Sequence, residues 1–148
     1  MTDWQKKWGR QTMDKALNYM ALARKAGRIE LGEEPVGAAA RAQHARLVVV
    51  ASDASDHTWR RAKSFVAGTG QECLKVPFAK DEMGLAIGRT SLAIAAITDP
   101  GLALALAESL ESKDPKVTAA LQQKLQHQQQ RKKEADAHRR NLRKGKKK

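Results

Sequence analysis

Residues 21–53 read ALARKAGRIELGEEPVGAAARAQHARLVVVASD, and residues 84–99 follow a similar pattern, GLAIGRTSLAIAAITD. Each stretch sets a short apolar strand, at 47–51 and 93–98, beside a turn that contains glycine and bears arginine. Glycine turns and helix N-termini leave backbone N–H groups unpaired, so such turns are suited to an anionic ligand. The two stretches therefore predict two strands of the fold and a binding site beside them.

Helices and short strands alternate through the chain on both sides of these stretches. Gly27 follows a helical apolar pattern as its C-terminal stop, Ser55 offers an N-cap, and Asp99 and Pro100 form a helix start. The alternation predicts an α/β fold of the α/β/α sandwich type. The expected elements are helix 12–26, strand 29–31, helix 33–42, strand 47–51, a helix that includes 59–66, strand 74–76, helix 81–87, strand 93–98 and helix 100–110.

Charge is concentrated at the C-terminal end of the 148-residue chain. Lys and Arg number 28 against 16 Asp and Glu, and residues 113–148 hold 13 of the basic and 3 of the acidic ones. We predict an N-terminal arm at 1–11, one sandwich domain at 12–112 and a basic tail at 113–148. Because neutralising phosphates releases condensed counterions, a basic tail on a nearly neutral body favours a polyanionic partner, and nucleic acid above all.

The tail has strong helix formers but a short apolar stripe, Val117, Leu121 and Leu125. We therefore expect no hydrophobic face that docks on the body, and a tail that is helical near the body and disordered toward Lys148. The single Cys73 excludes an internal disulfide and is expected to be a small buried hydrophobe in a cytoplasmic protein. The first ten residues lack the apolar core of a signal peptide, and no apolar run approaches a membrane span.

The segments LARKAGRIELGEEPV, LVVVASD, MGLAIG and AIAAITDPG, in this order and spacing, resemble the L-seven-Ae group of kink-turn RNA-binding ribosomal proteins. The resemblance implies a three-layer α/β/α sandwich around a small mixed four-stranded sheet, with no cofactor. It also implies that structured RNA, ribosomal RNA in particular, is bound through two neighbouring loops, here 32–36 and 88–92.

The first of these loops departs from the motif of the kink-turn readers, Gly-x-Asn-Glu-x-x-Lys. Glu34, Pro35 and Ala38 stand at its Asn, Glu and Lys positions. The Glu34 carboxylate can accept from a guanine N–H edge, whereas Pro35 and Ala38 offer no side-chain hydrogen bond, and Glu33 repels phosphate. Arg41 shares a helical face with Glu34 and is expected to supply a partial replacement.

The candidate RNA-binding residues come from both loops and their approaches. Lys25 and Arg28 either contact phosphate or complement the C-terminal end of the first helix. Arg60, Arg61 and Lys63 are expected to form a solvated face. The candidates are Lys25, Arg28, Gly32, Glu33, Glu34, Arg41, Arg89, Thr90 and Ser91, and the candidates for non-specific phosphate contacts in the tail are Arg131, Lys132, Lys133, Arg139, Arg140, Arg143 and Lys144.

Aromatic and histidine residues add little to this interpretation. Trp4 and Trp8 either stack on unpaired bases or fold onto the body, and Trp59 is expected in the core. The four histidines lack metal-ligand spacing, and no nucleophile elbow or Walker loop is present. The sequence thus indicates neither a metal, nor a small-molecule substrate, nor catalysis.

The leading hypothesis is a non-catalytic RNA-binding protein associated with the ribosome or its RNA. One alternative is a protein that coats nucleic acid irrespective of sequence through its basic tail. Another is the substrate-guiding domain of an RNA-modifying enzyme, whose activity would reside in a partner protein.

Overall fold

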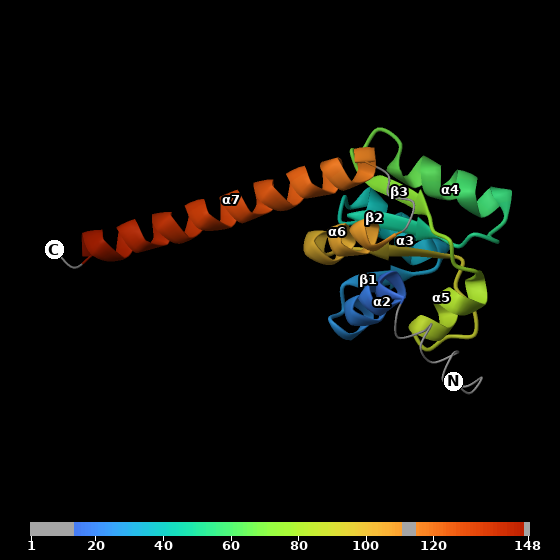
Figure 1. Cartoon of the computed structure of the whole chain (residues 1–148). Helices are drawn as coiled ribbons and strands as arrows, with labels where there is room; N and C mark the ends of the chain where they lie inside the picture. Colours follow the sequence, from blue (N-terminus) through green and yellow to red (C-terminus); the bar gives the residue numbers. More distant parts are fainter. Residues whose placement is uncertain (1–13, 111–114, 147–148) are drawn as a thin grey trace, which may run out of the picture.

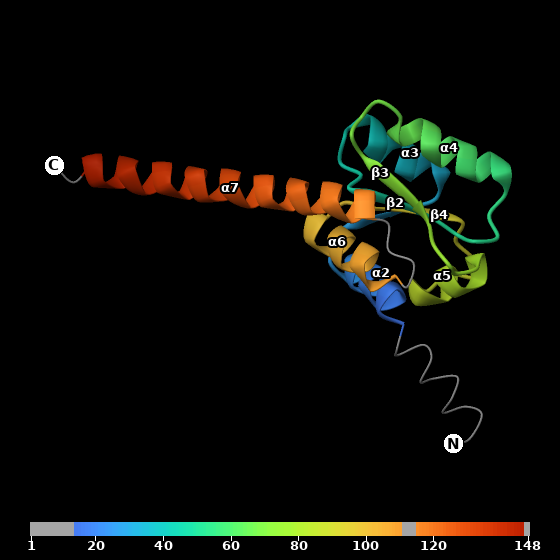
Figure 2. The same cartoon turned by 45° about the horizontal axis from the view of Figure 1, so that its top comes forward.

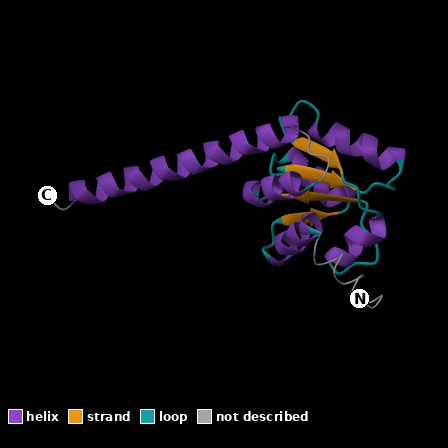
Figure 3. Cartoon of the chain, in the orientation of Figure 1, coloured by secondary structure: helices purple, strands orange, loops and turns teal. Residues whose placement is uncertain are grey.

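The computed structural model describes residues 14–110 and 115–146. Their secondary structure alternates as the sequence predicts (Figure 3), with element bounds that differ from the expected ones by a few residues. The elements are α2 (Lys15–Lys25), β1 (Ile29–Leu31), α3 (Glu33–Arg41), β2 (Leu47–Val50), α4 (Asp56–Val66), β3 (Glu72–Lys75), α5 (Lys80–Ala86), β4 (Ile94–Ile97), α6 (Pro100–Ser109) and α7 (Pro115–Lys146).

Four strands form one mixed sheet in the order β1-β4-β2-β3. β4 is antiparallel to both β1 and β2, whereas β2 and β3 are parallel. The carboxyl ends of β1, β2 and β3 therefore lie beside the amino end of β4. We call this edge the loop end of the sheet, and the opposite edge, where β2 and β3 begin and β4 finishes, the root end.

Helices cover both faces of the sheet, which confirms the three-layer sandwich. Figure 2 shows α3 and α4 on one face, with α2, α5 and α6 on the other. Alternate residues of β2 serve the two layers: Leu47 and Val49 join the core under α2, α5 and α6, while Val48 and Val50 join the core under α3 and α4. All four are fully buried, as expected of a β-branched strand covered on both faces.

Two predicted helix caps are present. Ser55 Oγ accepts a hydrogen bond from the Thr58 amide at 3.2 Å, and Asp99 Oδ2 accepts one from the Leu102 amide at 2.8 Å. Asp53, two residues before Ser55, accepts a hydrogen bond from the Lys80 amide at 2.8 Å and so satisfies a backbone donor at the start of α5.

Residues expected in the core show intermediate burial. Trp59 and Cys73 pack against the core beneath α3 and α4 without being fully buried. Lys63 Nζ lies 5.4 Å from the centroid of the Trp59 ring, a distance typical of a cation–π contact. Trp4 and Trp8 lie outside the described residues.

Helix α7 docks on the body through its first turns. Val117 and Leu121 are buried in the same core as α2 and α6, and Lys124 Nζ donates to the Gly70 carbonyl at the root end. The expectation that the tail lacks a docking face is therefore wrong for these turns. Apolar residues spaced by four lie one above the other on a helix, so Val117 and Leu121 pack on the body from the same side of α7.

Beyond this anchor, α7 extends away from the sandwich (Figure 1), and its 32 residues make a helix about 48 Å long. The side chains of residues 128–142 are exposed. Local pairs support the exposed part: Arg139 Nη2 lies 2.8 Å from Asp136 Oδ1, and Gln130 Nε2 donates to Glu134 Oε1 at 3.2 Å. Neither α7 nor any other described helix is apolar over the length that a membrane crossing requires.

Candidate nucleic-acid interface

The two predicted loops meet at the loop end of the sheet. The Gly32 amide donates to the Ile94 carbonyl at 3.0 Å, which joins the end of β1 to the start of β4. Gly32 then turns the chain into α3 with φ 98°, a value that glycine adopts without the steric cost of a side chain. The amino end of α3 consequently lies beside the segment 88–92 that precedes β4.

The second loop, 88–92, is held against α5. The Arg89 amide donates to the Gly84 carbonyl at 2.8 Å, and the Leu92 amide donates to the Lys80 carbonyl at 2.9 Å. Leu92 is buried, while Arg89, Thr90 and Ser91 are exposed. The loop is thus anchored by its backbone and by one apolar side chain, and it presents a guanidinium and two hydroxyl groups to solvent.

Gly84 decides how closely α5 approaches this loop. A β-carbon at Gly84 would lie 2.6 Å from the Ser91 nitrogen and 2.9 Å from the Arg89 carbonyl oxygen. Both distances are far inside van der Waals contact, and both partners are backbone atoms. The glycine of the MGLAIG segment therefore allows the loop to pack against the helix, a role that the sequence motif alone did not indicate.

Glu33, at the amino end of α3, is held by α4. Its carboxylate accepts from Thr58 Oγ1 at 3.3 Å and lies 3.4 Å from Arg61 Nε. The Arg61 guanidinium also lies 5.1 Å from the centroid of the Phe65 ring. Because this cation partly neutralises the carboxylate, the repulsion of phosphate expected from Glu33 is reduced. Arg61, expected to belong to a solvated face, is part of the loop end.

The exposed face of α3 carries the residues that depart from the kink-turn motif. Glu34, Pro35 and Ala38 are all exposed. Arg41 lies seven residues beyond Glu34, about 10 Å along the helix axis. Its Nη1 would be 3.4 Å from a β-carbon at Gly37, so the guanidinium extends back along α3.

Lys25 and Arg28 do not lie with the two loops. The Arg28 carbonyl accepts from the Thr98 amide, beyond the final residue of β4, which places Arg28 at the root end. The three residues of β1 span about 10 Å between this position and Gly32. The structure therefore groups Gly32, Glu33 and Glu34 with Arg89, Thr90 and Ser91, and separates Lys25 and Arg28 from them.

The tail candidates lie on α7. The side chains of Arg131, Lys132, Lys133, Arg139 and Arg140 are exposed, while those of Arg143 and Lys144 lie outside the described residues. Because α7 is rooted at Gly70, opposite the loops, these charges are separated from the loop end by the length of the sheet or more. In the part of the chain that the structure describes, no three His, Cys, Asp or Glu side chains gather as a metal-binding group.

Comparison with known proteins places the chain in a family. A scan of family models finds no match. The chain is 33% identical over 97 residues to the RNA-binding protein YlxQ of Enterococcus faecium, an alignment that covers 66% of this chain and 92% of the relative. The chain belongs to the L-seven-Ae group, among its YlxQ-like members. The resemblance in its sequence segments is thereby confirmed.

Solved structures agree with this assignment at the level of the fold. A Bacillus halodurans protein of unknown function matches the YlxQ-like chain with a TM-score of 0.61 and 27% identity, over 65% of this chain and 96% of its own. The 15.5-kDa RNA-binding protein of Giardia lamblia matches with a TM-score of 0.55 and 20% identity, over 72% and 87% of the two chains. Both likenesses support the α/β/α architecture.

Proposed function

We propose that this chain is a non-catalytic, cytoplasmic RNA-binding protein that recognises structured, kink-turn-like RNA and associates with the ribosome or its RNA. The observation that carries the proposal is the meeting of the two family loops at the loop end, together with 33% identity to a protein named as RNA-binding. Gly32 to Glu34 and Arg89 to Ser91 form the contact surface, where the exposed hydroxyl and guanidinium groups of the second loop suit the phosphates of a bent backbone.

The altered first loop determines which groups of the RNA this surface recognises. Pro35 and Ala38 contribute no side-chain hydrogen bonds, so discrimination falls to Glu34 and to the second loop. Glu34 is exposed and accepts from guanine N–H groups, and Arg89 donates to phosphate. We expect a preference for bent RNA that is weaker than the preference of a reader with the complete motif.

The basic helix α7 supplies affinity that does not depend on sequence. Removing one cation that binds a phosphate reduces the slope of log affinity against log salt by about 1. Replacing Lys132, Lys133, Arg139 and Arg140 by Gln in the full chain should therefore weaken binding to every RNA alike. Replacing Arg89 and Ser91 by Ala should instead remove the preference for bent RNA and reduce the slope by only about 1, because Arg89 is the single cation removed.

The deciding measurement compares a kink-turn RNA, the same RNA with its G·A pairs replaced, and a DNA duplex of equal length, at two salt concentrations. Preference for the intact kink-turn that disappears in the Arg89 and Ser91 variant supports the proposal. Equal affinity for all three, abolished by the α7 substitutions, would favour the alternative of nucleic-acid coating. This alternative is considered because the basic residues of α7 are exposed.

A further inference from the structure

The root end of the sheet carries a cationic hollow of about 810 Å³ that lies apart from the two loops. Arg46 and Pro100 line it from the body, and Lys124, His127 and Arg131 line it from α7, together with glutamines of that helix. Among the residues that the structure describes, no Asp or Glu contributes to this lining. Of these residues only Arg131 belongs to the set that the sequence suggested for phosphate contacts.

Arg46 carries an unsatisfied donor in this hollow. Its backbone amide donates to the Ile97 carbonyl at 2.8 Å, which fixes the residue where β4 finishes. Its side-chain Nε is buried and has no hydrogen-bond partner within the part of the chain that the structure describes. Leaving a buried donor unpaired destabilises a folded protein, and more so when the donor belongs to a charged group. An anion in the hollow would lie beside the guanidinium that carries this covered donor and would balance its charge.

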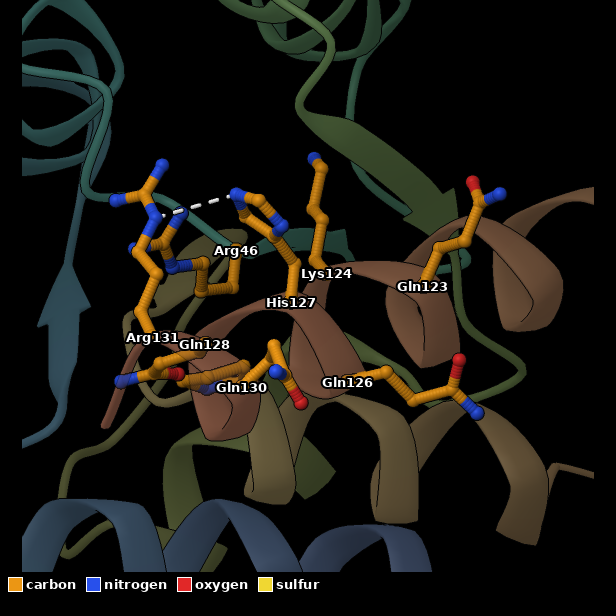
Figure 4. A pocket seen from close by; sticks show the side chains of 9 residues that line it. Arg46, Gln123, Lys124, Gln126, His127, Gln128, Gln130 and Arg131 are labelled. Atoms are coloured by element: carbon orange, nitrogen blue, oxygen red, sulfur yellow. Dashed lines mark hydrogen bonds between the residues drawn. The ribbon is translucent and has the colours of Figure 1, made fainter. Parts of the chain in front are cut away.

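Three side chains of α7 face Arg46 at this place. Lys124, His127 and Arg131 are spaced by three and four residues, so they share one side of the helix, and Figure 4 shows them projecting on the side where Arg46 lies. Arg131 Nε donates to His127 Nε2 at 3.1 Å. This bond holds the Arg131 guanidinium beside the imidazole, and both side chains line the hollow.

The cations around the hollow affect one another. Burial lowers the pKa of Lys124 below its ordinary value; the carboxylate of Glu72 opposes this shift, and the positive charge of Arg46 adds to it. Cations brought together from two elements, with a buried guanidinium donor unpaired, make a site in which an anion relieves both repulsion and desolvation.

We infer that Arg46, Lys124, His127 and Arg131 form a second anion site, which takes a phosphate group from an RNA segment that flanks the region held at the loop end. This inference rests on the proposed function and extends it. A strand of four residues spans about 13 Å, so one folded RNA can reach both ends of the sheet. The root of α7 then contributes a defined contact, in addition to the diffuse attraction of its distal charges.

The direct test follows the Nε–H signal of Arg46 by NMR in the full-length protein. Two probes are titrated: inorganic phosphate, and a kink-turn RNA with or without a single-stranded flank. We expect phosphate and the flanked RNA to shift this signal, and the RNA without a flank to leave it in place. A signal unmoved by every probe overturns the site. A signal that moves with phosphate but not with flanked RNA overturns the assignment to RNA and indicates a free phosphate instead.

Substitutions test the contribution to affinity. Arg46→Gln should lower affinity for the flanked RNA about tenfold and reduce the salt slope by about 1. Arg60→Gln, the same chemical change at an exposed position of α4, should alter affinity less than twofold. Equal effects of the two substitutions would contradict a defined site.

Arg131→Gln preserves the test if Arg46→Gln unfolds the protein, because Arg131 is exposed on α7 and outside the core. It should also lower affinity for the flanked RNA more than Arg60→Gln does. None of these substitutions should change the ratio of affinities for the intact and the G·A-replaced kink-turn. If the unsubstituted protein shows no preference for the intact kink-turn, the proposed function is refuted. The NMR response of Arg46 to phosphate and to flanked RNA tests the second anion site separately from that preference.

Discussion

Arg61 Nε lies 3.4 Å from Glu33 Oε2, so a cation of α4 neutralises a carboxylate at the amino end of α3. Thr58 donates to the other oxygen of the same carboxylate at 3.3 Å. The pair is partly exposed, with 46% of the Arg61 side chain and 36% of the Glu33 side chain accessible. Its contribution to the free energy of folding is therefore small, about 0.2–1 kcal/mol. The pair matters more for RNA binding, because it reduces the negative charge at the loop end.

Glu33→Gln should strengthen RNA binding. The substitution removes one negative charge from the loop end and releases Arg61, and a unit charge roughly 7 Å from a phosphate in water is worth about 0.6 kcal/mol, or about threefold in affinity. Filter binding or fluorescence anisotropy at low and high salt measures the gain, which should fade with screening. Glu108→Gln on α6 is the control of equal charge. A loss of affinity in Glu33→Gln would show that the carboxylate itself contacts RNA.

Gly84→Ala should disturb the second loop. The added methyl group would lie 2.6 Å from the Ser91 nitrogen, so the backbone of the loop has to move. We expect a loss of about 1–3 kcal/mol in the free energy of unfolding, together with weaker RNA binding.

Gly68→Ala controls for the removal of a glycine in the Gly84 experiment. It adds a methyl group at a positive-φ position where no atom of the described residues lies within 4 Å of the new carbon. It should lower the melting temperature through backbone strain but leave the preference for kink-turn RNA intact. A Gly84→Ala protein with unchanged RNA preference would contradict the role assigned to loop 88–92.

Leu121→Ala should destabilise the body although the residue belongs to the basic helix. Leu121 is fully buried in the core, and removing a buried leucine side chain costs about 2–5 kcal/mol. Leu142→Ala is the same substitution on the same helix at a position that is 54% exposed, and it should have almost no effect. Thermal or denaturant unfolding compares the two variants. Similar stabilities would mean that α7 does not dock.

The packing of Val117 and Leu121 determines where α7 can be truncated without destabilising the body. A chain that ends after residue 112 lacks Val117 and Leu121 and should melt at a lower temperature, so its weaker RNA binding would have two causes. A chain that ends after residue 130 keeps the anchor at Gly70 and removes the distal basic residues. Its melting temperature should match that of the full chain. If it melts earlier, the exposed part of α7 also stabilises the body.

Cys73 should react slowly with thiol reagents. Burial raises the pKa of its thiol, the neighbouring Glu72 carboxylate raises it further, and Lys63 opposes both. Less thiolate is therefore present at pH 8 than in an unfolded chain, and the rate of reaction with a disulfide reagent should rise only at pH values above the ordinary thiol pKa. Glu72→Gln should speed the reaction and Lys63→Gln should slow it. Equal rates in folded and urea-unfolded protein would contradict the burial of this group.

The pKa of Cys73 also links folding to pH. Because the folded state retains the thiol proton to a higher pH than the unfolded state does, the stability from this group is complete below the unfolded pKa, near 9. It declines as pH rises through the raised folded value. The depressed pKa of Lys124 acts in the opposite direction at alkaline pH. Cys73→Ala should consequently remove part of the alkaline loss of stability, as measured by denaturation between pH 8 and 10.

Local sequence was enough to predict the elements of this fold. The run LVVVA predicts a strand covered on both faces, and all four residues of β2 are fully buried. Ser55 and Asp99 predict helix starts, and both make the expected capping bonds. These features depend on periodicity and on hydrogen bonds between residues close in the chain. They can therefore be predicted from residues that are neighbours in the sequence.

Tertiary structure alone decided which candidate residues lie together. Arg28 is only four residues from Gly32 in the sequence, yet β1 carries the chain across the sheet between them, because each strand residue advances about 3.3 Å. Arg61 joins the loop end through the packing of α4 on α3, and Gly84 through the packing of α5 on loop 88–92. No local pattern encodes either contact. The docking of Leu121 and the meeting of Arg46 with α7 depend on packing between segments that are far apart in the sequence. The sequence by itself thus determined the elements, the family and the basic tail, while the three-dimensional packing divided the charged residues between two ends of one sheet.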